Sequence, residues 1–292
     1  MDYKLYRVLM GVFYGLAALF CVIFNSMVLI AFYKDPLKKL RKLFNYLLIH
    51  LCLCDLMAGL ACFPIASLSS FTFKDERLVH VMNIAGKIAL PLLHAGFFTT
   101  VLLSYDRYKA ISEPIKYRQN ATLKRFYCYV GAVWAISLVL ASVFFSFHSL
   151  TQSLVINFVM FMTVFIILVV LYYRVRNVLH ANQSETQNSN EDLLLSDANE
   201  NAVLTRVANE KRALSTCKLI FLLQLLTISI AIATDIYIEV KGSKIKTIQE
   251  KAFMKMIFYI PSPISRLGNP LICMIRMTDF KNSIKALLGR RN

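Results

Sequence analysis

Two combinations of aspartate and arginine stand out in a sequence rich in apolar side chains. Asp106 and Arg107 are neighbours, whereas Asp55 and Arg266 are distant in sequence and each lies within a long apolar stretch. A charge in such surroundings needs an opposite charge, because burying it alone is expensive. These residues therefore predict ion pairing. The sequence has no nucleophile–base pair, metal-ligand cluster or phosphate-binding glycine loop, so we expect no enzymatic activity.

The residues lie on seven long apolar stretches. Of the 292 residues, 57% are hydrophobic, whereas roughly 45–50% is usual in a soluble domain. A helix needs about 20 apolar residues to cross a hydrocarbon core about 30 Å thick. Continuous apolarity favours helices over barrel strands, in which apolar residues alternate. We predict seven transmembrane helices over residues 8–32, 43–69, 79–105, 126–147, 153–173, 214–240 and 252–273.

Only the polar run from His148 to Gln152 separates the fourth and fifth stretches. Read as one helix, the two would reach roughly 75 Å, which no bilayer accommodates by tilt. We therefore predict a turn and a very short loop at this run.

Two further segments lie outside the spans. Residues 182–209 are rich in Asn, Ser, Glu and Asp, and such a composition predicts a flexible loop. After the seventh span, apolar residues recur at helical spacing from Phe280 to Leu288, which predicts a short amphipathic helix over residues 277–289 on the membrane surface. The expected fold is an all-α membrane protein: one seven-transmembrane helix bundle over residues 1–292, followed by this short amphipathic helix.

The net charge of +16 is distributed unevenly. Most lysines and arginines fall on one side of the predicted membrane if the N-terminus is outside. The positive-inside rule then predicts a multi-pass plasma-membrane protein with a cytosolic C-terminus. Anionic membrane lipid is a sufficient partner for the basic edges, so no nucleic-acid partner is expected. All seven cysteines lie inside or at the cytosolic ends of spans, and we predict no disulfide.

The polar residues within the spans occur in a recognisable order. The third span ends in Asp106-Arg107-Tyr108, which continues to Pro114 and Tyr117. The other positions, in chain order, are Asn25, Asp55, Trp134, Tyr172, Asn269 and Pro270. This set resembles the rhodopsin-like G-protein-coupled receptors over nearly the whole chain, and the run from Asp106 to Tyr117 is its most specific part.

The resemblance implies a receptor that carries an extracellular ligand signal to a heterotrimeric G protein, with arrestin as a further expected partner. It implies that Asp106 holds Arg107 at the cytosolic face. Activation would release Arg107 toward Tyr172 while helix six moves outward. Pro270 would permit a kink in helix seven, because it removes a backbone hydrogen bond. The switch set is Asp106, Arg107, Tyr108, Pro114, Tyr172, Asn269 and Pro270.

The chain departs from the family pattern at several positions. Cys273 replaces the usual tyrosine after Asn-Pro, and residues 219–234 of helix six contain neither Trp nor Pro. The cysteine that usually ties helix three to the second extracellular loop corresponds to Met82. Ala89 stands where amine receptors have an aspartate, and Pro263 where opsins have their retinal-binding lysine. Amine and retinal ligands are therefore both disfavoured.

The extracellular ligand is not identified by the remaining polar residues. Lys87 and His94 lie seven residues apart, which places them on one helical face, and an inward-facing Lys87 could meet an anionic ligand. Lys87 equally fits a side chain that snorkels outward to the membrane surface. Asp235 and Glu239 equally fit charges at the end of a helix. The ligand-binding candidates are Asn83, Lys87, His94, Asn157, Asp235 and Glu239.

Family members commonly bind a sodium ion between the helix-two aspartate and polar groups on helices three and seven. Here the corresponding positions hold Gly96 and Arg266. We predict that Arg266 pairs with Asp55 in place of sodium, in a core polar network with Asn25, while Gly96 leaves room for the guanidinium. Arg266 could instead reach another acceptor or backbone carbonyls.

Two other functions remain open at this point. A seven-helix transporter is disfavoured because no repeat symmetry or pair of broken helices is apparent. A receptor-like protein that binds a ligand without coupling to a G protein is the other alternative.

Overall fold

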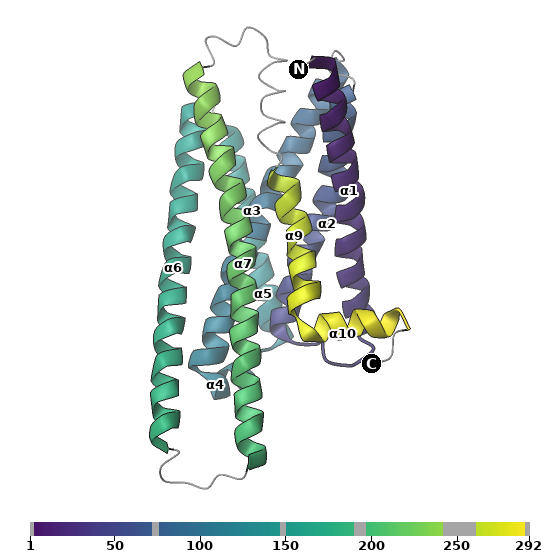
Figure 1. Cartoon of the computed structure of the whole chain (residues 1–292). Coiled ribbons are helices and arrows are strands. Elements are labelled where there is room, and N and C mark those ends of the chain that lie inside the picture. The colour runs from purple at the N-terminus through teal and green to yellow at the C-terminus, as the bar shows by residue number, and fades with distance from the viewer. Residues whose placement is uncertain (1–2, 72–75, 147–149, 190–196, 242–260, 290–292) are drawn as a thin grey trace.

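The computed structural model describes residues 3–71, 76–146, 150–189, 197–241 and 261–289. Within these ranges, seven helices run side by side, and two shorter ones, α4 and α10, follow the third and the last of them (Figure 1). The bounds are α1 (Tyr3–Lys34), α2 (Leu43–Phe71), α3 (Glu76–Ser112), α4 (Pro114–Asn120), α5 (Leu123–Ser146), α6 (Leu150–Ser189), α7 (Asp197–Lys241), α9 (Pro261–Arg276) and α10 (Thr278–Leu287).

Each of the first six predicted spans corresponds to one long helix. Within the described ranges, six helices are long and apolar enough to cross a membrane: α1, α2, α3, α5, α6 and α7. The seventh predicted span, 252–273, falls partly outside the described residues, and its remainder forms α9. The all-α seven-helix bundle predicted from the sequence is confirmed.

The structure differs from the prediction between helices five and six. Residues 182–189 continue α6, and residues 197–209 form the start of α7, so most of the predicted loop 182–209 is helical. Helices propagate cooperatively from an existing turn, and the Ala, Glu, Leu and Arg residues before position 214 favour the helix. Residues 190–196 lie outside the described part.

Two smaller differences concern the connections. Leu150 begins α6, so Thr151 and Gln152 are helical and not part of the predicted turn, while residues 147–149 lie outside the description. The sequence reading also missed α4, which starts with a proline at its first position, Pro114. Proline suits that position because the backbone N–H it lacks would have no helical partner there.

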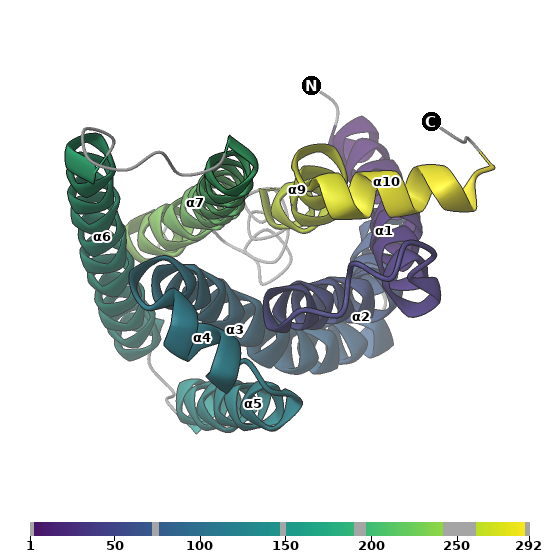
Figure 2. The ribbon, with the colours of Figure 1, turned by 90° about the horizontal axis from the view of Figure 1, so that it is seen from below.

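The bundle closes into a ring when viewed from below (Figure 2). Neighbouring helices pack in order from α1 to α3, α5 packs outside α3 and α2, and α9 fits between α7 and α1. Gly268 allows the close approach of α9 to α7, because a Cβ atom there would lie 2.6 Å from Cδ1 of Leu223. The main apolar core lies toward the end of the bundle that carries α10 and includes Leu47, Leu51, Leu103 and Ile220.

The short helix α10 crosses the end of the bundle at a steep angle to the long helices (Figure 1). Phe280 and Ser283 are buried against the bundle, whereas Lys281 and Leu288 are exposed. Asp279 in its first turn accepts a hydrogen bond from Nζ of Lys42 at 2.8 Å. The observed helix, Thr278–Leu287, agrees with the predicted range 277–289.

Candidate functional site

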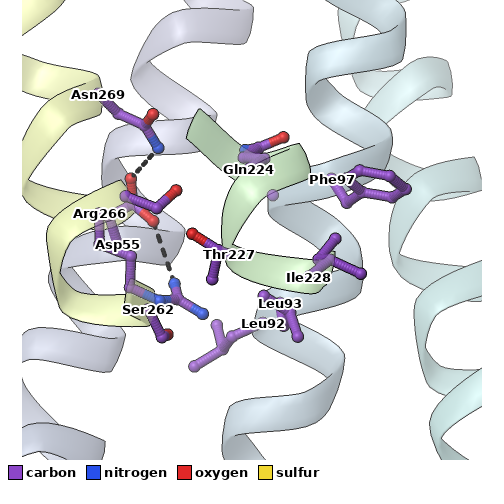
Figure 3. Close-up of a pocket in the computed structure, with 12 residues that line it drawn as sticks. Asp55, Leu92, Leu93, Phe97, Gln224, Thr227, Ile228, Ser262, Arg266 and Asn269 are labelled. Atoms are coloured by element: carbon purple, nitrogen blue, oxygen red, sulfur yellow. Dashed lines mark hydrogen bonds and ion pairs between the residues drawn. The ribbon is translucent and has the colours of Figure 1, made fainter. Parts of the chain in front are cut away.

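The ion pair predicted between Asp55 and Arg266 is present in the middle of the bundle (Figure 3). Nη1 of Arg266, on α9, lies 3.0 Å from Oδ1 of Asp55, on α2, and only 8% and 3% of the two side chains are exposed. Nδ2 of Asn269 donates to the other carboxylate oxygen, Oδ2, at 2.8 Å. Both oxygens of Asp55 are therefore satisfied by α9, which fixes this helix against α2.

The space around the pair is small. A cavity of about 20 Å³ lies beside it, and its wall includes Gly96 from α3 and Gln224 and Thr227 from α7 (Figure 3). Gly96 borders the cavity as predicted. Such a volume suits about one water molecule, so this region can hold the ion pair but not an organic ligand.

Asn25 is close to this network but does not join it directly. Its side chain is buried, and Nδ2 donates to the backbone oxygen of Cys21 at 2.9 Å. The thiol of Cys21 in turn donates to the backbone oxygen of Asp55 at 3.3 Å. Asn25 thus connects α1 to the backbone of α2, and not to the carboxylate or the guanidinium as the predicted network implied.

A second polar connection, centred on His50, was missed by the sequence reading. Nε1 of Trp134 donates to Nε2 of His50 at 3.0 Å, and Nδ1 of His50 lies 2.9 Å from Oγ1 of Thr99. An indole N–H can only donate, so Nε2 accepts and Nδ1 carries the hydrogen. The hydroxyl of Thr99 donates a hydrogen bond to the backbone oxygen of Ala95. These hydrogen bonds join α5, α2 and α3. A histidine inside an apolar span was the sequence feature that could have indicated them.

The C-terminal end of α3 carries the other aspartate–arginine pair. Nη2 of Arg107 bonds to Oδ2 of Asp106, and both side chains are almost fully buried. The hydroxyl of Tyr117, on α4, lies 2.9 Å from each Asp106 oxygen and accepts from Arg107 at 3.1 Å. The guanidinium carbon of Arg107 sits 4.1 Å from the centre of the Phe44 ring. Carboxylate, phenol and aromatic ring together hold Arg107 in one position.

The other residues predicted for the switch lie on several helices, and their described contacts are with other residues. The hydroxyl of Tyr172, on α6, lies 3.4 Å from Oγ of Ser104. Pro114 begins α4, and Pro270 lies within α9. Tyr108 packs its ring against that of Tyr105.

An exposed ion pair joins α3 to the start of α4. Nζ of Lys109 donates to Oε1 of Glu113 at 2.7 Å. This hydrogen bond lowers the pKa of the Glu113 carboxyl below its usual value.

A larger cavity of about 170 Å³ opens beside Arg107. Its wall is formed by the start of α2, residues 212 and 213 of α7 and the junction of α9 with α10. Its charged residues are Lys42, Arg107, Arg212, Arg276 and Asp279.

The ligand-binding candidates are not brought together. Lys87 is exposed, together with the neighbouring Ile84 and Ile88, whereas His94 is buried within the bundle. The two residues thus lie in different environments, contrary to the shared inward face that the spacing allowed. The side chains of Asn83, Asn157, Asp235 and Glu239 lie outside the described part.

Comparisons with known proteins agree with this geometry. Residues 24–154 match the family model of the 7 transmembrane receptor (rhodopsin family). The fold resembles squid rhodopsin with a TM-score of 0.83, over 98% of this chain and 86% of that one, at 17% sequence identity.

Three curated relatives are also receptors. The histamine H2 receptor of Cavia porcellus is 28% identical over 51% of this chain and 40% of its own length. The muscarinic acetylcholine receptor M3 of Sus scrofa is 31% identical over 43% of this chain and 21% of its length. Dopamine receptor 2 of Caenorhabditis elegans is 31% identical over 36% and 13%. The chain thus matches less than half the length of each. The family model over residues 24–154, the relatives and the fold all show similarity to the rhodopsin-like (class A) G-protein-coupled receptors.

Proposed function

We propose that this receptor transmits an extracellular signal across the plasma membrane to a heterotrimeric G protein, through a switch centred on Arg107. The observation that carries the proposal is the buried cluster of Arg107 with Asp106 and Tyr117 at the edge of a cytosolic cavity. The carboxylate that pairs with Arg107 belongs to the same helix, α3, so this ion pair can open without the separation of two helices. Arg107 can therefore change partners at a modest energetic cost.

Helix α7 is the element that would move. It packs against α3, α6 and α9, and Arg212 from α7 lines the cavity next to Arg107. An outward movement of α7 would widen this cavity and let Arg107 turn toward Tyr172, whose hydroxyl now contacts Ser104. The opened cavity would receive the G protein and, in the same place, arrestin.

The orientation of the chain follows from its charges. We place the N-terminus outside and the C-terminus in the cytosol, because most basic residues then lie on the cytosolic side. The amphipathic α10, with Phe280 buried and Lys281 exposed, would then lie at the inner membrane surface.

The ligand would differ from those in the names of the relatives. An ammonium ligand needs a carboxylate, and the corresponding residue on α3 is Ala89, which is half-buried and uncharged. We therefore propose that the receptor does not recognise a biogenic amine through this position. A ligand screen that reports receptor conformation, with histamine, acetylcholine and dopamine included, tests this. We expect no response to any of the three. A response to one of them that Ala89→Leu abolishes would contradict the proposal.

Coupling is tested with purified receptor and G proteins from each major class. We expect Arg107→Ala to remove the basal nucleotide exchange promoted by the wild type, because the cavity loses the residue that would contact the G protein. Arg118→Ala is the matched control, since Arg118 is an exposed cytosolic arginine outside the cavity. Equal exchange by wild type and Arg107→Ala would contradict the switch. No exchange by the wild type or by the released variant Asp106→Asn would favour the non-coupling receptor.

A further inference from the structure

The cytosolic cavity of about 170 Å³ carries an excess of positive charge. Two of its four cations are already neutralised, because Arg107 is paired with Asp106 and Lys42 lies 2.8 Å from Asp279. The remaining positive charge comes from Arg212, on α7, and Arg276, on α9.

Arg212 and Arg276 meet no carboxylate in the part of the chain that the structure describes. Nη2 of Arg276, on α9, donates to the hydroxyl of Ser215 at 3.0 Å, and Ser215 lies one turn along α7 from Arg212. Both arginine side chains are exposed to solvent at the cavity. Guanidinium groups offer two parallel N–H donors, a geometry that matches the oxygens of a phosphate.

The cavity also lies where phosphate groups are concentrated in a cell. Met277, Thr278 and Asp279, at the start of α10, form part of its wall. In the proposed orientation α10 rests on the inner leaflet, so the cavity opens at the level of its anionic headgroups. The positive end of the α10 dipole adds to the attraction of the two arginines.

We propose that this cavity binds a phosphate-bearing anion, with Arg212 and Arg276 as the anchoring side chains. The volume is several times the roughly 30 Å³ that one water molecule occupies, and so it accommodates a phosphate group. The headgroup of a phosphoinositide in the inner leaflet and a soluble inositol phosphate present the same chemistry. A phosphate held by both arginines bridges α7 and α9 at their cytosolic ends.

The test uses the full-length receptor without any G protein, so its outcome is independent of the coupling proposed above. One arm measures the Kd of inositol trisphosphate by calorimetry with receptor in phosphatidylcholine nanodiscs. The other arm measures retention of phosphatidylinositol bisphosphate by native mass spectrometry, with that lipid added to the nanodiscs. Binding of the soluble ligand identifies a soluble source, and retention of the lipid alone identifies the membrane headgroup.

We expect Arg212→Gln/Arg276→Gln to weaken binding about thirty-fold, from a contribution of about fivefold per arginine near an anionic surface. The matched control is Arg118→Gln/Lys124→Gln, which removes the same charge from exposed residues outside the cavity and should bind nearly as tightly as the wild type. Arg212→Lys/Arg276→Lys should fall between, because it keeps the charge but loses the two-pronged donor. If Arg212→Gln/Arg276→Gln lowers the thermal unfolding midpoint, the loss of affinity in Arg212→Lys/Arg276→Lys relative to the wild type serves as the test instead.

Two results would overturn the proposal. The first is a wild type that binds neither the soluble nor the lipid ligand. The second is an equal loss of affinity in the cavity variant and in the control variant, which would show only the general attraction of a basic surface.

Discussion

The molecule contains two buried aspartate–arginine pairs with opposite connectivity. Asp55 and Arg266 are 211 residues apart and join α2 to α9, whereas Asp106 and Arg107 are adjacent on α3. The first pair can be broken only if two helices lose a shared contact, while the second can open by a rotation of one side chain. In the proposed mechanism the same chemistry would serve as a fixed tie in the middle of the bundle and as a releasable latch at the end of α3.

The largest effect is expected from breaking the tie. Arg266→Leu leaves the Asp55 carboxylate without its cation, and we expect a loss of about 3–5 kcal/mol in the free energy of unfolding. Asp55→Leu should cost a similar amount, because Arg266 then stays charged and unpaired. Thermal unfolding of the purified receptor in one detergent measures both.

The double variant Asp55→Leu/Arg266→Met serves as the control, since removing both charges of a buried pair is often nearly neutral. Its unfolding midpoint should recover toward that of the wild type. A double variant as unstable as the single ones would mean that the pair is not the source of the loss.

A smaller change in stability but a larger change in signalling is expected at the latch. Asp106→Asn removes the negative charge that holds Arg107, and a hydrogen bond to a charged group contributes about 1.5–3 kcal/mol. We expect a stability loss at the lower end of this range, because Tyr117 still contacts Arg107, and a several-fold rise in basal nucleotide exchange. Unchanged exchange, at equal receptor concentration, would remove the distinction between tie and latch.

Tyr117→Phe should have a weaker effect of the same kind. The variant keeps the ring but loses the hydroxyl that contacts both Asp106 and Arg107, so we expect about 1 kcal/mol of lost stability. Basal exchange should rise less than in Asp106→Asn. Tyr105→Phe is a suitable comparison, because that tyrosine lies on α3 outside the cluster.

No effect at all is expected when sodium is replaced by choline in the exchange assay. The guanidinium of Arg266 already occupies the carboxylate of Asp55 at 3.0 Å, which leaves no anionic site for a further cation. The assay should therefore give equal basal rates in the two salts at equal ionic strength. A sodium-dependent rate in the wild type would show that the pair opens.

The tie was predictable from sequence because a charge in an apolar span has few possible partners, and Asp55 and Arg266 left little choice. The seven spans were predictable for a similar reason, since a continuous apolar segment that crosses a membrane satisfies its backbone hydrogen bonds as a helix. The contacts of His50 were missed because its two partners, Thr99 and Trp134, lie on different helices. No local sequence pattern indicates that these residues meet.

Other differences arise from tertiary context. The spacing of Lys87 and His94 places them on one side of α3, but it does not say where neighbouring helices cover that side. Lys87 lies where α3 is uncovered, and His94 lies where it is buried. The polar residues after position 182 predicted a loop, because composition indicates only how much apolar surface a segment can bury. In the structure α6 continues to Ser189, because a helix that is already formed extends cooperatively.

The seven cysteines offer a practical consequence. All are free thiols, and most of them are buried inside the bundle. Assembly of this receptor then requires no oxidising compartment and no disulfide isomerase. Bacterial membranes and cell-free synthesis into nanodiscs are accordingly suitable production routes, and strong reductants can be kept in every purification buffer.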